Sequence, residues 1–301
     1  MKAALLPAYG DANAFEVKDA PEPQPKAGEI KVRLVAASLN PIDWKVRSGS
    51  YKQFMTLELP AILGRDAAGE VVQLGEGVTA FKAGDKVLGF VSNAYAEFVA
   101  APVEAWAKAP AGLDLASSAV IPLVALTGAQ LATGGVNAKS GETVLVIGAN
   151  GGVGRAAVFV LKKLGAKVIA GVRRKQLAEA ESIHADSVVA LDDADAVAQL
   201  PQLDALADTV GGATTQKLLG KLKAGGRIGS VVGEPAGAKD RGFTVQAIFT
   251  KPDPKVLAEL AKAVADGKLL LPVARRFPLA QVSDAHRLAE AGGVGKVLLT
   301  F

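Results

Sequence analysis

The hydrophobic residues follow two different patterns of spacing along the chain. Up to about residue 110, short apolar runs such as 29–38 (EIKVRLVAAS) are separated by Gly, Asp and Asn, which is typical of β-strands joined by turns. From about residue 114, apolar runs alternate with amphipathic segments of helical period. The second pattern predicts a parallel sheet that is covered by helices on both faces.

In the second region, predicted strands alternate with predicted helices. Residues 142–148 predict a strand, 151–165 a helix that closes at Gly165, and 166–172 a second strand. The alternation continues with a helix at 174–182 and further strands at 187–191, 203–211, 226–233 and 243–249. A last helix at 252–268 precedes a tail of mixed strand and helix.

Composition narrows the class of protein. The 301 residues suffice for one large or two medium domains, and 50% hydrophobic with 21% charged residues is a globular profile. The net charge of +4 is small, and the basic residues are spread out, which disfavours nucleic-acid binding. The apolar stretch 116–132 contains Pro, Gly and Gln, so it predicts a buried helix pair rather than a membrane span. We therefore expect a soluble, cytoplasmic protein with no membrane partner.

A glycine-rich loop lies between the predicted strand 142–148 and the helix after it. Its glycines are Gly148, Gly151, Gly152 and Gly154. In a strand–loop–helix unit, such glycines allow a tight turn and a close approach to a pyrophosphate, which the helix N-terminus then binds. We expect dinucleotide contacts from this loop at Gly148, Asn150, Gly151, Gly152 and Val153.

The end of the second strand predicts which dinucleotide is bound. An acidic residue here would bind the ribose 2′-hydroxyl of NAD, but the chain has Arg173, Arg174 and Lys175. These side chains fit a 2′-phosphate, which predicts NADPH as the cofactor. The alternative, a solvated helix start, is weakened because cations are disfavoured at a helix N-terminus.

The ends of the later strands supply further candidates. Gly211 ends one of the predicted strands, and Val231, Val232 and Gly233 end another. Ligands of open α/β sheets lie at the carboxyl ends of the strands, so we expect contacts with the nicotinamide there.

Several segments together resemble a known family. They are GANGGVG, SLNPIDWKVRSGSY, LGRDAAGEVVQLGEGVTAFKAGDKVLGF, YAEFVAAP, ALTGAQ, DTVGG and the final GKVLLTF. They are similar, in the same order and over nearly the whole chain, to the zinc-independent quinone oxidoreductase branch of the medium-chain dehydrogenase/reductase superfamily. The resemblance implies an α/β protein: a GroES-like catalytic domain at 1–115, completed by 269–301, and a Rossmann NADP-binding domain at 116–268. It also implies a homodimer and a cofactor in the interdomain cleft.

The resemblance extends to the absence of zinc ligands. Zinc-dependent relatives have Cys where this chain has Asn40, and Gly-His-Glu where it has Gly64-Arg65-Asp66. The chain has no cysteine, and its two histidines lie in unrelated segments, so a zinc site of the usual nitrogen and sulfur kind is not expected. We expect His184 at a helix end and His286 in a surface or packing position.

The resemblance also assigns candidate roles to individual residues. Asn40 is a catalytic candidate that binds substrate or the nicotinamide ribose, or else a turn residue, whereas Asp43 is expected to cap a short helix. Tyr51 is the second catalytic candidate; it stacks on a flat ring or donates a proton, or it only packs. Thr127 and Lys296 match positions that contact the cofactor, although Lys296 also fits a surface lysine before a strand.

These expectations favour an oxidoreductase that transfers hydride from NADPH to a quinone. A quinone or an activated alkene accepts hydride without a metal ion, and the cofactor carries the chemistry. Two alternatives stay open at this point: an enone or 2-alkenal reductase, and a low-turnover NADPH-binding protein that senses redox state.

Overall fold

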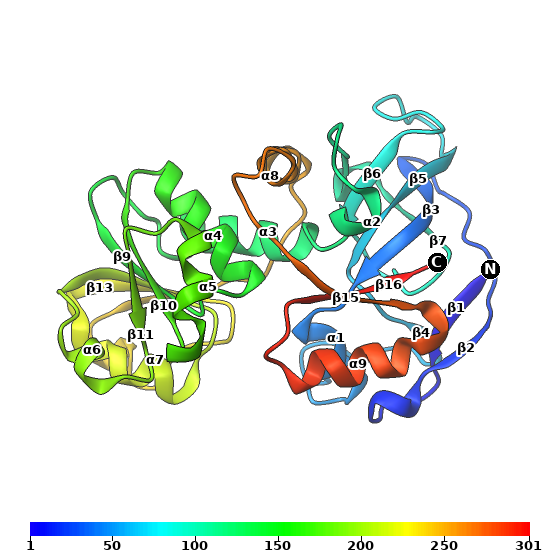
Figure 1. Cartoon of the computed structure of the whole chain (residues 1–301). Helices are drawn as coiled ribbons and strands as arrows, with labels where there is room; N and C mark the ends of the chain where they lie inside the picture. The colour runs from blue at the N-terminus through cyan, green and yellow to red at the C-terminus, as the bar shows by residue number, and fades with distance from the viewer. The chain divides into compact units, whose positions relative to one another are not determined.

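The computed structural model describes residues 1–301, which divide into two compact units (Figure 1). The first unit comprises Met1–Leu123, Pro252–Asp266 and Leu271–Phe301, and the second comprises Val124–Lys251 and Gly267–Leu270. The domain boundaries predicted from the sequence placed 252–268 in the second unit. Helix α8 (Pro254–Ala265) instead groups with the first unit, because it packs against strand β8 (Trp106–Lys108).

The first unit is built on a seven-stranded sheet and a smaller three-stranded one. The large sheet has the order β15 (Val273–Pro278), β16 (Lys296–Thr300), β3 (Glu29–Ser38), β5 (Asp66–Leu74), β6 (Lys86–Phe90) and β8, and β7 (Phe98–Pro102) also pairs with β3. The small sheet has the order β2 (Glu16–Asp19), β1 (Lys2–Leu6), β4 (Ala61–Ile62). The predicted strand 29–38 is confirmed as β3, and it is central because it pairs with three neighbours.

Short helices complete the first unit. They are α1 (Pro41–Arg47), α2 (Leu115–Ser118) and α9 (Val282–Ala291). Figure 1 shows α9 running beside β15 and β16, which it contacts. The apolar face of α9 is buried through Val282 and Ala285, which join the same core as Ile30 and Val32 of β3. The tail of the chain is therefore part of the first core.

The second unit has the predicted doubly wound architecture. Its six parallel strands have the order β11 (Ser187–Ala190), β10 (Lys167–Val172), β9 (Thr143–Ile147), β12 (Leu203–Asp208), β13 (Leu222–Ser230), β14 (Thr244–Ala247). Successive residues of β9 bury on opposite faces: Val144 and Val146 join one core cluster, and Leu145 and Ile147 join another. Both faces are thus covered by helices, as the continuous apolar runs predicted.

The helices of the second unit are mostly short. They are α3 (Pro122–Gln130, which begins in the first unit), α4 (Gly152–Lys163), α5 (Leu177–Ala180), α6 (Ala194–Ala198) and α7 (Gly212–Leu218). The helix predicted at 174–182 is instead broken into a 3₁₀ turn, α5 and a second 3₁₀ turn. Only Ala180 and Ile183 are buried there, so a single turn of helix is all that packing supports.

The apolar stretch after residue 114 belongs to the core. By length and composition alone, Leu115–Gly135 could cross a membrane, but 72% of its most apolar window is buried inside the structure. It divides into α2, α3 and a π-helical turn at Leu131–Gly135. A broken and mostly buried segment of this kind is typical of a core helix pair.

Helix α3 packs unusually close to α4. A methyl group added at Gly128 would lie 2.6 Å from the Ala156 Cβ atom and 2.6 Å from the Val153 carbonyl oxygen. Neither of these two atoms belongs to the flexible end of a side chain. The steric clash could therefore be relieved only if the two helices moved apart. Glycine at this position therefore sets the spacing of the two helices.

We predict that Gly128→Ala destabilises the protein by about 1–3 kcal/mol, because the added methyl overpacks the α3–α4 contact. Gly134→Ala, six residues further along the chain, is the matched control, since no atom beyond its own helical turn lies within 4 Å of the added methyl. Urea unfolding of both variants measures the difference. Equal stability of the two variants would contradict the packing argument.

Candidate functional site

The glycine loop forms a tight turn between β9 and α4. Gly148 has φ +80°, a left-handed conformation that side chains rarely adopt. A methyl group on Gly154 would lie 2.3 Å from the Gly148 carbonyl oxygen, so the first turn of α4 rests directly on the loop. The first N–H groups of a helix have no intrahelical partners, and they carry the positive end of its dipole. The start of α4, at Gly152 and Val153, therefore offers a site for phosphate.

A buried arginine fixes the tip of this loop. The Arg155 side chain is nearly inaccessible; its Nε lies 3.1 Å from the Asn150 carbonyl oxygen and its Nη2 lies 2.5 Å from Asn150 Oδ1. The same guanidinium also contacts Ser182 Oγ at 3.0 Å and Glu179 Oε1 at 3.2 Å. Burial lowers the pKa of Arg155, and Glu179 opposes that shift. Arg155 thus ties the glycine loop to the α5 segment, a role that the sequence motif did not reveal.

Arg173, Arg174 and Lys175 are exposed directly after β10, at the same edge of the sheet. Arg174 is paired with Asp193, with 2.5 Å between Nη2 and Oδ2. Arg173 has a weaker local contact, 3.4 Å from its Nε to Gln176 Oε1. The structure places these three cations where the sequence predicted them, and it shows that the two arginines are not equivalent.

The residues predicted after β12 and β13 meet at this edge too. Gly211 has φ +74°, and a methyl group there would lie 3.0 Å from Val232 Cγ2. The Asp208 carboxylate at the end of β12 accepts the Gly211 N–H at 2.8 Å, and its own side chain is fully buried. Val231 donates its N–H to the Asp208 carbonyl oxygen, and Gly233 follows with φ +105°. The buried Asp208 carboxylate therefore helps to fix the backbone of this turn, for which the sequence analysis named Gly211 but not Asp208.

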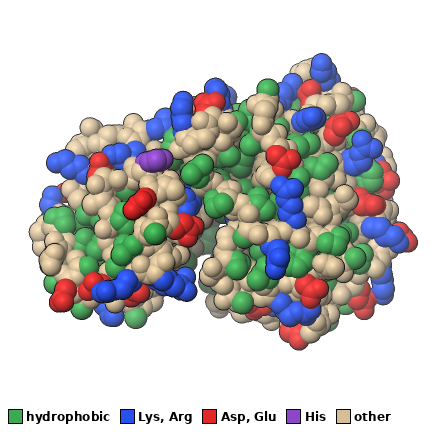
Figure 2. Space-filling view, viewed as in Figure 1, with side chains coloured by type: hydrophobic (Ala, Val, Ile, Leu, Met, Phe, Trp, Pro, Cys, Tyr) green, Lys and Arg blue, Asp and Glu red, His purple; other side chains and the backbone are tan.

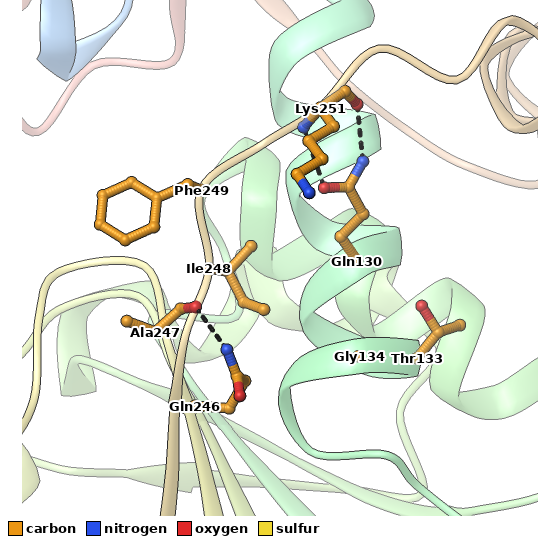
Figure 3. A pocket seen from close by; sticks show the side chains of 8 residues that line it. All are labelled: Gln130, Thr133, Gly134, Gln246, Ala247, Ile248, Phe249 and Lys251. Carbon is orange, nitrogen blue, oxygen red and sulfur yellow. Dashed lines mark hydrogen bonds between the residues drawn. The ribbon is translucent and has the colours of Figure 1, made fainter.

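Thr127 lies on α3, where its hydroxyl is 2.6 Å from that of Thr250. One turn further along α3, the Gln130 side chain forms two hydrogen bonds with the backbone of Lys251 (Figure 3). These contacts fix the segment after β14 against α3. A cavity of about 350 Å³ lies beside them, and Phe249 at its wall is 69% exposed. The cavity is lined by Gln130, Thr133, Gly134, Gln246, Ala247, Ile248, Phe249 and Lys251.

The remaining candidates lie in the first unit, where β3, β5 and β16 come together. In the strand register, Ser38 is opposite both Asp66 and Leu298. The Lys296 ammonium lies 2.6 Å from Asn40 Oδ1, 3.0 Å from the Leu39 carbonyl oxygen and 3.6 Å from Asp66 Oδ2. With its side chain only 12% exposed, Lys296 is not the surface lysine that one interpretation of the sequence allowed.

Asp66 is the anionic centre of this cluster. Its side chain is fully buried and accepts hydrogen bonds from Ser38 Oγ at 2.7 Å, Asn40 Nδ2 at 2.8 Å and the Leu123 N–H at 2.6 Å. Burial lowers the pKa of Lys296, and Asp66 opposes that shift. Both polar atoms of the Asn40 side chain are occupied within the protein, which favours a positioning role for Asn40 over direct contact with a substrate.

Asp43 caps α1 as predicted. Its Oδ2 accepts the Asn40 N–H at 2.8 Å and the Tyr95 hydroxyl at 2.9 Å. Burial raises the pKa of Asp43 to about 6, against the effect of these two hydrogen bonds. Tyr51 follows α1 and is half-buried, with its ring 4.9 Å from that of Phe54, which is 65% exposed. The two rings form an aromatic surface next to the capped helix.

His286 is a packing residue, fully buried between Phe15 and Tyr95. Its Nδ1 lies 3.1 Å from Arg47 Nη1, and because arginine only donates, Nδ1 is the acceptor and the ring is neutral. Burial, together with the charge of Arg47, lowers the pKa of His286 to about 3. Arg47 is itself buried and pairs with Glu290 at 2.7 Å. His184, in contrast, ends a 3₁₀ turn with φ +56°, as expected of a helix-end residue.

The donor set at Asn40, Arg65 and Asp66 does not fit zinc. An amide and a guanidinium are not zinc ligands, and the Lys296 ammonium already lies against the Asn40 and Asp66 oxygens. No group of three or more His, Cys, Asp or Glu side chains in residues 1–301 is arranged to hold a metal ion. An ammonium thus supplies the positive charge at this point of the fold.

Two protein families match parts of the chain. The family described as alcohol dehydrogenase GroES-like domain matches residues 26–111, and the family described as zinc-binding dehydrogenase matches residues 183–299. The structure of a quinone oxidoreductase from Coxiella burnetii superposes with a TM-score of 0.91 and 30% identity, over 100% of this chain and 99% of that one. The expected GroES-like and Rossmann-like folds are confirmed.

Two curated relatives extend the comparison. The chloroplast envelope quinone oxidoreductase homolog of Arabidopsis thaliana is 37% identical over 189 residues, which are 60% of this chain and 57% of that protein. The match thus spans less than three fifths of that relative. The acryloyl-coenzyme A reductase of Metallosphaera sedula is 28% identical over 100% of both chains.

We predict that the stability advantage of the wild type over His286→Gln shrinks as the pH falls from 7 to 4. The folded state holds His286 neutral, with its pKa lowered from 6.5 to about 3, so its contribution is complete above pH 6.5 and is lost on acidification. Glutamine retains an acceptor for Arg47 but does not titrate. Asp43 titrates in the opposite sense in both proteins, so its effect cancels in the difference.

Urea unfolding at a series of pH values measures this difference. His184→Asn is the matched control, because His184 is exposed and asparagine tolerates its left-handed backbone. A stability difference between wild type and His286→Gln that stays constant from pH 7 to 4 would contradict the assignment of a buried neutral imidazole.

Proposed function

Because the chain belongs to the quinone oxidoreductase branch of the medium-chain dehydrogenase/reductase superfamily, we propose that it is an enzyme that transfers hydride from NADPH to a quinone. The relatives that support the branch are the oxidoreductases of Coxiella burnetii and Arabidopsis thaliana. Side chains of both charges are interspersed on the face shown in Figure 2, and such a surface suits a small-molecule enzyme better than a nucleic-acid-binding protein.

The observation that carries the cofactor proposal is the edge formed by the carboxyl ends of β9 and β10. The start of α4 offers N–H groups and a positive dipole end to a pyrophosphate. On the neighbouring strand, Arg173 and Arg174 follow β10 as exposed guanidinium groups. An adenosine with a 2′-phosphate needs both features next to each other, whereas NADH needs a carboxylate in place of the arginines.

NADPH supplies the hydride from its nicotinamide ring, and the chain supplies binding, orientation and charge. We assign the pyrophosphate to the loop of Gly148, Asn150 and Gly151, and the nicotinamide to the turns at Gly211 and Val231–Gly233, with Thr127 as a further contact. The Lys296 ammonium is held by Asn40 and Asp66, so it provides a fixed positive charge in the first unit. The homodimer expected from the family belongs to the same proposal.

The proposed acceptor follows from the polar groups of the first unit. Since Asn40, Arg65 and Asp66 do not fit zinc, the acceptor must be electron-poor enough to take hydride without a metal Lewis acid. A quinone meets this condition and is flat. The rings of Tyr51 and Phe54 offer a surface for stacking on such a ring, and the Tyr51 hydroxyl offers a proton.

A second candidate is reduction of an activated alkene. The full-length similarity to the acryloyl-coenzyme A reductase favours it, because that protein matches this chain from end to end. An α,β-unsaturated carbonyl takes hydride at its β-carbon and a proton at its α-carbon, so it requires the same cofactor and a proton donor. The two candidates differ only in the acceptor.

An acceptor screen distinguishes them. Purified protein treated with a chelator is mixed with NADPH and, in parallel, with 1,4-benzoquinone, 9,10-phenanthrenequinone and a series of 2-alkenals, and NADPH loss is followed by absorbance. We expect the highest kcat/KM with a quinone and no loss of activity on chelation. A higher kcat/KM with 2-alkenals would establish the second candidate, and no turnover with any acceptor would contradict both.

The arginines give a separate prediction. Arg173→Asp/Arg174→Ser should raise the KM for NADPH at least about tenfold, because charge-assisted bonds of about 1.5–3 kcal/mol each are lost. The KM for NADH should not rise. The control is Lys167→Ala, which removes an exposed positive charge at the opposite end of the same strand β10. An unchanged KM for NADPH in the double variant would remove these residues from the cofactor site.

A further inference from the structure

Arg174 is held by two carboxylates that the strand register places beside it. In the pairing of β10 with β11, Val172 lies opposite Ala190, so Arg174 and Asp192 follow their strands at the same distance. The Arg174 N–H donates to Asp192 Oδ1 at 2.7 Å, and the guanidinium Nη2 lies 2.5 Å from Asp193 Oδ2. Both the backbone and the side chain of Arg174 therefore have an acidic partner.

Asp193 is itself fixed in place. Its Oδ1 caps α6 by accepting the N–H groups of Asp195 at 3.1 Å and Ala196 at 3.4 Å. Its other oxygen, Oδ2, is the one that pairs with Arg174. The Asp193 side chain is only 26% exposed, whereas that of Arg174 is 67% exposed. The ion pair thus joins an anchored carboxylate to a solvent-accessible guanidinium.

Arg173 differs from its neighbour in its partners. Its Nε contacts Gln176 Oε1 at 3.4 Å, and its other guanidinium nitrogens form no hydrogen bond or ion pair within the chain. Arg173 can bind an incoming phosphate without losing a carboxylate. The Arg174 guanidinium must break its ion pair with Asp193, or bind both anions at once, before it binds the same phosphate.

We propose that Asp193 competes with the cofactor 2′-phosphate for Arg174 and thereby sets how strongly the site prefers NADPH over NADH, a proposal that rests on the proposed NADPH function. Arg173 is then the main contact for the 2′-phosphate. Asp193 lowers the affinity for the phosphorylated cofactor and leaves the affinity for NADH unchanged, because NADH has no group that engages Arg174.

The test is Asp193→Asn, which removes the negative charge and keeps a side chain that caps helices as well as aspartate does. Calorimetric titration of the full chain compares adenosine 2′,5′-bisphosphate with 5′-AMP, two ligands that differ only in the 2′-phosphate. Asp193→Asn should bind the bisphosphate about two- to fivefold more tightly than wild type, the range that corresponds to one exposed ion pair. The affinity for 5′-AMP should not change.

Two controls isolate the ion pair. Asp195→Asn removes the same charge two residues away, in the first turn of the same helix, and should leave the bisphosphate affinity at the wild-type value. In an Arg174→Ala background, Asp193→Asn should not change the affinity for the bisphosphate, because Asp193 then has no guanidinium with which to pair. If Asp193→Asn loses the α6 cap and unfolds at lower temperature, Asp193→Ser repeats the test with another capping side chain.

The outcomes separate this proposal from the proposed function. If wild type binds the bisphosphate more tightly than 5′-AMP, but Asp193→Asn matches wild type or Asp195→Asn matches Asp193→Asn, the competition is wrong while the NADPH assignment stands. If wild type does not distinguish the two ligands, the NADPH assignment fails and the competition fails with it.

Discussion

The close approach of α4 to the end of β9 is the constraint on which the second unit depends. The Gly148 carbonyl oxygen occupies the space that a side chain at Gly154 would need, and Gly128 lets α3 pack against the same helix. These contacts bring the positive end of α4 to the carboxyl edge of the sheet, beside the turns after β10, β12 and β13. The backbone geometry there offers N–H groups to a phosphate, and in the proposed function the side chains after each strand decide which dinucleotide is bound.

The first unit depends on a charge rather than on a close contact. The Asp66 side chain is buried where β3 and β5 meet, and hydroxyl, amide and backbone donors surround its carboxyl group while the Lys296 ammonium lies nearby. Removing one partner of such a cluster leaves a buried charge uncompensated, which is costly. The Lys296 ammonium provides a covalently attached positive charge beside the buried Asp66 carboxyl group.

Much of the fold and part of the candidate site were predictable from the sequence. The strand periods located β3, β9, β10 and β11, the glycine spacing located the phosphate loop, and the basic residues after β10 located the proposed 2′-phosphate site. The interactions that the sequence did not predict join distant segments: Arg155 with Glu179, Asp193 with Arg174, and Lys296 with Asp66. The hydrophobic periodicity of the sequence does not predict such pairs, because they depend on which strands become neighbours in the fold. The grouping of α8 with the first unit was missed for the same reason, since it follows from contact with β8.

We propose that the carboxyl edge of the parallel sheet binds a dinucleotide that carries a 2′-phosphate. Calorimetric titration of the unmodified chain with NADPH and with NADH, at one fixed ionic strength, tests it most directly. We expect NADPH to bind at least about tenfold more tightly than NADH, since one additional charge-assisted contact contributes about 1.5–3 kcal/mol. Equal dissociation constants, or tighter binding of NADH, would contradict it.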